Sequence, residues 1–154
     1  MNETLKNELL ADPLTRGFAS LSDPEILAVN SVPDRVIYSD IPVEELASAI
    51  FMSPIYGILE AAAASNENAR KLLRIVEGAG RVEIFRYSRS ETRAALDGML
   101  ADLVANVDGF TEDHATALKA LGTSTGTRWQ ELGIDPTERD IFLIMDPVRK
   151  ASGE

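Results

Sequence analysis

The sequence contains no cysteine, one histidine and one tryptophan, and these shortages exclude several kinds of chemistry. Without cysteine the chain can form neither a disulfide bond nor a thiolate metal site. A zinc site would need an uncommon set of carboxylate ligands, because His114 is the single imidazole. A Cys-His nucleophile pair is impossible, and no Gly-x-Ser-x-Gly elbow occurs. The sequence therefore predicts no catalytic, cofactor-binding or metal-binding residues, and no cofactor.

Long apolar runs are also missing. The longest weakly polar stretch, residues 50–64, is interrupted by Ser53, Pro54, Gly57 and Glu60, whereas a membrane-spanning helix needs about 20 predominantly apolar residues. No charged region followed by an apolar stretch resembles a secretion signal. We expect no membrane segment, and a protein that is made and kept in a reducing cytoplasm.

Basic residues are scarce relative to acidic ones: 15 bases against 25 acids give a net charge of −10. Non-specific nucleic-acid binding depends on Lys and Arg that neutralise phosphates, so we expect no direct nucleic-acid partner. The acids are spread along the chain, which is typical of a solvated surface. An alternative remains open, in which carboxylates spaced like phosphates on one face imitate a nucleic acid.

Helix signals, in contrast, are frequent in this chain of 154 residues. Ser22-Asp23-Pro24-Glu25 and Ser88-Arg89-Ser90-Glu91 both have the form of a capping box. The second box is expected to open the longest helix, because apolar residues follow it at spacings of three and four. Leu5, Leu9 and Leu10 predict a first helix with one buried face, and Pro13 should end it.

Further helices are predicted from proline and polar caps at their starts and from glycine at their ends. Their expected starts lie near Pro42, Pro54, Ser65, Thr111, Trp129 and Asp135. Asp146-Pro147 is expected to end the last helix, and residues 122–127 are expected to link two helices.

Two segments have β-branched or aromatic residues instead of a helical pattern: residues 35–38 and 81–87. Two interpretations remain open, because an isolated two-stranded ribbon is marginally stable. The segments either pair as a small hairpin-like ribbon or form extended connectors that pack on helices. The predicted fold is mainly α: a single-domain bundle of short helices over residues 1–148, with or without one small two-stranded β ribbon. Residues 149–154 are expected to form a short polar C-terminal tail.

Two apolar sites are candidates for a protein interface. Phe51, Met52, Ile55 and Tyr56 lie in the most apolar region of the chain, and the sequence allows either a subunit contact or a place in the interior. Arg128-Trp129 combines two residue types that are enriched at binding hot spots, although core packing of the tryptophan is the alternative. Carboxylate pairs such as Glu44-Glu45 and Asp97-Asp102 are better explained by solvation than by acid-base catalysis.

Two sequence patterns are similar to those of small proteins encoded by tailed bacteriophages. The first is Glu8-Leu9, Asp12-Pro13-Leu14, Gly17-Phe18, Asp23 and Asn30, with Phe18 where the family usually has tyrosine. The second comprises Leu118, Leu121-Gly122-Thr123 and Thr127-Arg128-Trp129-Gln130-Glu131-Leu132-Gly133-Ile134. Between Val32 and Asn106 the chain resembles the family only in its helical character.

The resemblance implies a bacteriophage protein that is made in the cytoplasm of the bacterial host and becomes part of the virion. It implies a non-enzymatic structural or accessory role in a capsid, connector or tail. The expected partners are other phage structural proteins, in a homo-oligomer or multi-copy assembly. An alternative is an acidic phage protein that binds and inhibits a host factor. The resemblance does not indicate the location within the virion, the copy number or the symmetry.

Overall fold

The computed structural model describes residues 2–78 and 83–153, and these residues are mainly α-helical, as the sequence predicts. Helices account for 61% of the structure and strands for 8%. By their contacts the residues divide into two compact units. Unit 1 is formed by Met1–Ile37 and Thr125–Glu154, and unit 2 by Tyr38–Ser124.

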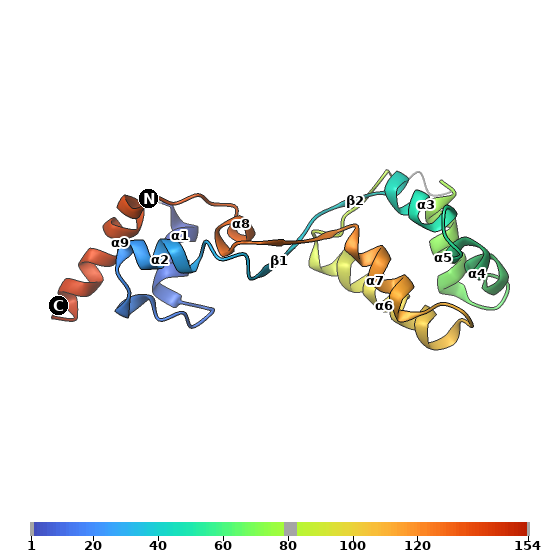
Figure 1. Ribbon diagram of the computed structural model, residues 1–154, viewed down its shortest axis with the longest axis horizontal. Coiled ribbons are helices and arrows are strands. Elements are labelled where there is room, and N and C mark those ends of the chain that lie inside the picture. Colours follow the sequence, from blue (N-terminus) through green and yellow to red (C-terminus); the bar gives the residue numbers. More distant parts are fainter. Residues whose placement is uncertain (1, 79–82, 154) are drawn as a thin grey trace. The chain divides into compact units, whose positions relative to one another are not determined.

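Unit 1 consists of helices from both ends of the chain (Figure 1). Its helices are α1 (Glu3–Ala11), the 3-10 helix η1 (Phe18–Ser20), α2 (Asp23–Val29), α8 (Arg128–Leu132) and α9 (Glu138–Ala151). Helix α9 packs against both α1 and α2. The core of unit 1 is a cluster of buried apolar side chains from these helices: Leu5, Leu9, Phe18, Ile26, Trp129, Ile141, Ile144 and Met145.

Unit 2 is a continuous segment with a separate apolar core. Its elements are β2 (Ile41–Pro42), α3 (Val43–Phe51), α4 (Ile55–Ala62), α5 (Glu67–Val76), β3 (Ile84–Phe85), α6 (Ser90–Asn106) and α7 (Glu112–Ala120). Helix α5 packs against α3, α4 and α6, and α7 packs against α6. Leu96, Leu100 and Leu103 are buried along α6, at the three- and four-residue spacing that the sequence showed.

In the described residues, the two predicted strand segments do not pair with each other. Residues 35–38 form β1, which pairs with β4 (Thr123–Gly126), the segment that was expected to be a helix linker. Within the other segment, β3 pairs antiparallel with β2, with Ile41 opposite Phe85; Arg81 and Val82 lie outside the described residues. Of the two interpretations left open, the mutual ribbon is not the one found: each segment pairs with a strand that carries a weak strand signal, since β4 holds small polar residues and β2 is two residues long.

Some predicted helix starts are confirmed and others are displaced. Ser22 and Glu25 form the expected capping box of α2, and Thr111 caps α7. Ser88 makes no cap, because its backbone and hydroxyl groups donate hydrogen bonds to Asp40 and α6 begins after Arg89. Asn66 caps α5 in place of Ser65.

Helix α9 differs from its prediction at both ends. Thr137, not Asp135, caps it, in a capping box with Asp140. Asp146-Pro147 does not end the helix, which continues through Pro147 to Ala151. The last turn is held by Arg149, which donates to the Leu21 carbonyl at 2.9 Å and forms an ion pair with Asp23 at 2.7 Å. These contacts offset the hydrogen bond that proline removes inside a helix.

Helix α1 ends before Pro13 as expected, but its buried face is different from the predicted one. Leu5 and Leu9 are buried, whereas Leu10 is 51% exposed. The third buried position of the helix belongs to Glu8, which is 3% exposed. A buried carboxylate requires a charged partner, and this partner comes from the other end of the sequence.

Candidate functional site

Parts of the two sequence patterns, at residues 8–30 and 128–133, meet in unit 1 through a charged network. Arg128 donates to both carboxylate oxygens of Glu8, at 2.8 Å and 2.7 Å. Its remaining terminal nitrogen donates to Glu131 at 2.7 Å. Arg35 binds the same Glu131 through two hydrogen bonds, at 2.7 Å and 3.1 Å. The network therefore joins α1, β1 and α8.

Local sequence places three of the four members of this network: Glu8, Arg128 and Glu131. Glu8 lies three residues after Leu5 on α1, so the helix turns it toward the same buried side. Thr127 caps α8 and begins the short helix, in which Arg128 and Glu131 are separated by three residues. Gly133 ends α8 in a left-handed conformation, with φ of 68°.

The turn after α1 uses the next residues of the first pattern. Asp12 has a left-handed backbone, and its carboxylate accepts hydrogen bonds from the backbone N–H groups of Arg16 and Gly17, both at 2.7 Å. The turn directs Phe18 into the core, where it is 1% exposed. Arg16 in turn forms two hydrogen bonds with Asp34 and donates to the Val29 carbonyl. These pattern residues thus stabilise the fold of unit 1.

Hydrogen bonds within this network shift the pKa values of Glu131 and Arg128 so that the charged forms are favoured. Hydrogen bonds from Arg35, together with the one from Arg128, lower the pKa of Glu131 to about 2. The bond to Glu8 raises the pKa of Arg128 above its ordinary value. Glu131 and Arg128 therefore stay charged near neutral pH, which makes them poor candidates for general acid-base catalysis.

Asn30, the last residue of the first pattern, is fully buried at the end of α2. Neither side-chain polar atom has a hydrogen-bond partner among the residues that the structure describes. Its burial was not predicted, because asparagine at a helix end is ordinarily a surface residue.

The six predicted interface residues occupy different environments. Arg128 and Trp129 lie inside unit 1: the Arg128 side chain is 12% exposed, and the Trp129 indole donates to the Leu27 carbonyl at 3.3 Å. Core packing, the alternative interpretation of Trp129, is the one that the structure supports. Ile55 belongs to the core of unit 2.

Phe51 and Met52 are exposed by 47% and 89% at the end of α3. The Phe51 ring contacts Tyr56, with the ring centroids 4.8 Å apart. Tyr56 is half-buried, and its hydroxyl lies 3.4 Å from a Glu77 carboxylate oxygen. Of the predicted residues, Phe51, Met52 and Tyr56 therefore form the part that remains at the surface.

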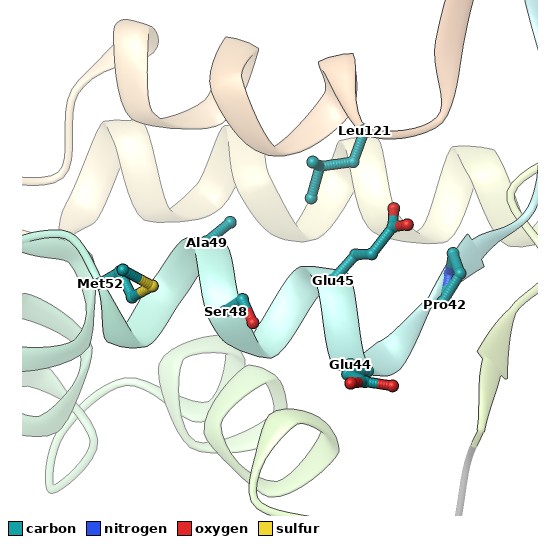
Figure 2. Close-up of a pocket in the computed structure, with 7 residues that line it drawn as sticks. All are labelled: Pro42, Glu44, Glu45, Ser48, Ala49, Met52 and Leu121. Atoms are coloured by element: carbon teal, nitrogen blue, oxygen red, sulfur yellow. The ribbon is translucent and has the colours of Figure 1, made fainter.

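An open groove of about 720 Å³ runs along α3 beside Met52 (Figure 2). We call it the α3 groove; its lining residues are Pro42, Glu44, Glu45, Ser48, Ala49, Met52 and Leu121. Figure 2 shows Glu45 and Ala49 on the side of α3 that faces Leu121, with Glu44 on the opposite edge. Sequence reasoning missed Leu121, which follows α7 and reaches the groove only through the packing of unit 2.

The other chemical candidates have structural explanations. The Nδ1 atom of His114 accepts a hydrogen bond from the Thr111 backbone at 3.1 Å, completing the capping box of α7. Asp102 accepts hydrogen bonds from Asn66, Asn68 and Asn106, which lower its pKa. Among the described residues, no group of three or more acidic or histidine side chains is placed to hold a metal ion.

Comparisons with known proteins give no relative: no family model, no curated protein and no solved structure matches this chain. Among the helices that the structure describes, none has the length and apolar character needed to cross a membrane.

Proposed function

We propose that this chain is a non-enzymatic bacteriophage protein that acts through protein–protein contacts, as a structural or accessory component of the virion. The observation that carries the proposal is the apolar surface at the end of α3, where Phe51 and Met52 are exposed beside the α3 groove. Exposed apolar side chains beside a groove are typical of protein-binding sites. The resemblance of the two sequence patterns to phage proteins supports the virion as the setting.

The charged residues of unit 1 support a non-catalytic role in a second way. Arg128, Glu8 and Glu131 are engaged with one another, and the pKa of Glu131 lies far below neutral pH. In unit 2, the His114 side chain accepts a hydrogen bond from the Thr111 backbone in the capping box of α7. These side chains are thus used to hold the fold.

Mass spectrometry of purified particles tests the proposal. Phage particles are produced from the encoding genome, banded by density, and compared with the lysate from which they came. We expect the protein to sediment with the particles in a fixed ratio to the major capsid protein. Its presence in the lysate together with its absence from the particles would reject the virion role.

A second candidate is an early phage protein that binds a basic host factor, and the net charge of −10 favours it. Binding of that kind should weaken steeply as salt is raised, because long-range attraction between charges is screened. A time course of infection distinguishes the two candidates, since a host-directed protein would accumulate before the capsid proteins and stay outside the particles.

A further inference from the structure

We propose that the α3 groove binds a partner segment that carries a lysine or arginine next to an apolar side chain. This inference rests on the proposed role in protein–protein contacts and specifies the chemistry of the partner. It follows from three features of the groove: its apolar floor, its exposed methionine and its acidic rim.

The floor and one end of the groove are apolar. Ala49 and Leu121 come from different elements and face each other across it (Figure 2). Met52 lies one helical turn beyond Ala49 and is 89% exposed. Methionine adapts its shape to irregular partners and is common at binding surfaces. An apolar side chain of a partner would remove Met52 and Ala49 from water together.

The rim of the groove is acidic. Helix α3 carries Glu44 and Glu45 in its first turn and has no basic residue. In the part of the chain that the structure describes, neither carboxylate is within ion-pair distance of a cation: the ion pairs found there involve other acids. A partner cation would therefore gain an interaction that the described chain does not already supply.

Charge complementarity selects a basic partner over a second copy of the chain. Each copy carries a net charge of −10 and an acidic α3, so two grooves facing each other would place like charges together. A lysine or arginine side chain suits both the apolar and the acidic part of the groove, because its long aliphatic stem packs on apolar surface while its charged end reaches the carboxylates. The adjoining apolar residue of the partner would occupy the space between Ala49 and Leu121.

The experiment uses the full-length chain and a yeast-displayed library of random 12-residue peptides. Peptides selected on the chain are expected to carry a basic residue beside an apolar one. The most enriched peptide is then synthesised, and its binding is measured by fluorescence anisotropy at two salt concentrations. NMR chemical-shift changes locate the contact; we expect them at Glu45, Ser48, Ala49 and Met52.

Matched variants separate the groove from other surfaces. Met52→Asp and Glu45→Lys should each weaken the peptide at least tenfold. Leu143→Asp, at a position 51% exposed in unit 1, and Glu67→Lys, at a side chain 73% exposed on α5, make the same chemical changes elsewhere and should leave binding unchanged. A peptide in which the basic residue is replaced by glutamate should prefer the Glu45→Lys variant.

Several results would overturn the inference: no enriched peptide, enrichment of acidic or uncharged peptides, or binding that Met52→Asp does not change. Sedimentation velocity could instead show a dimer that the Met52→Asp substitution dissociates. This result would identify a second copy of the chain as the occupant of the groove and would also overturn the inference. Absence from the virion leaves the peptide measurements unaffected, so failure of the proposed function and failure of this inference can be told apart.

Discussion

Arg128 links two acidic side chains that the sequence places far apart. It binds Glu8 from the first helix and Glu131 from its own helix. The Glu8 side chain is 2% exposed and the Arg128 side chain 12%. Removal of one partner from a buried ion pair is costly because the other charge stays buried without compensation. The side chain at position 128 therefore has a large effect on the stability of unit 1.

We predict that Arg128→Met destabilises unit 1 by about 3 kcal/mol, since Glu8 loses its partner. Urea unfolding monitored by Trp129 fluorescence measures this, because the single tryptophan of the chain belongs to the unit 1 core. The double variant with Glu8→Met as well should recover much of the loss, because it removes both charges. A double variant no more stable than Arg128→Met would show that packing, not charge, explains the effect.

Glu131 gives unit 1 a defined dependence on pH. Its pKa is lowered from the ordinary 4.5 to about 2 in the folded chain, chiefly by the hydrogen bond from Arg35. A carboxylate with a lowered folded-state pKa stabilises the fold fully above its unfolded-state pKa, and this contribution is lost as pH falls. The window is therefore about pH 4.5 to 2.

Within that window we predict that the wild type loses about 1 to 2 kcal/mol through Glu131; the figure includes a discount because the side chain is 28% exposed. Glu131→Gln should be less stable at pH 6 and should show a shallower fall between pH 5 and pH 2. Urea unfolding followed by Trp129 fluorescence at each pH provides the comparison. Parallel curves for the two proteins would contradict the assignment.

At the scale of elements, the connection between α7 and β4 depends on a close approach of chain segments at Gly122. A Cβ atom there would lie 2.5 Å from Cδ1 of Tyr87, 2.8 Å from Cγ1 of Ile41 and 2.9 Å from the backbone oxygen of Ser39. The Gly122 carbonyl also accepts a hydrogen bond from the Ser39 backbone at 2.9 Å. A backbone atom cannot move aside as a flexible side chain does, so the position requires glycine.

We predict that Gly122→Ala destabilises unit 2 by about 1 to 3 kcal/mol through overpacking. Gly98→Ala is the matched control: Gly98 lies inside α6 with open space around it, and alanine there should stabilise the helix by about 0.5 to 1 kcal/mol. Urea unfolding monitored by far-UV circular dichroism compares the two variants. If both changed stability in the same direction, the close approach at Gly122 would not be the cause.

For the whole molecule, the division into units follows from where the apolar clusters lie. The cluster of unit 2 lies entirely between Ile41 and Leu121, whereas that of unit 1 combines residues from both ends of the chain. Among the residues that the structure describes, none belongs to both clusters. The single domain predicted for residues 1–148 remains a prediction, and it depends on whether the units fold separately.

We predict that the segment 38–124, expressed alone, folds with the helical content of unit 2, because all described residues of its core lie within the segment. Circular dichroism and the dispersion of the amide NMR spectrum measure this. An unfolded segment would favour one cooperative domain for the complete chain. The Trp129 and circular-dichroism transitions of the intact protein provide the matching comparison.

The sequence by itself determined the helical character of the chain, several helix ends and the residues that cap them. The capping box at Ser22, the cap at Thr111, the helix stop at Gly133 and the leucine spacing of α6 are local properties, so neighbouring residues suffice to predict them. The apolar surface at Phe51 and Met52 was also a candidate from composition.

Tertiary structure alone decided the remaining features. Four of these features involve residues that are distant in sequence. They are the pairing of β1 with β4, the buried ion pair of Glu8 with Arg128, the continuation of α9 through Pro147, and the place of Leu121 in the α3 groove. Short polar strands carry little signal of their own, and a charged residue is buried only when its partner arrives from elsewhere. Local patterns determined the elements, and long-range contacts determined which of their faces became core, ion pair or open surface.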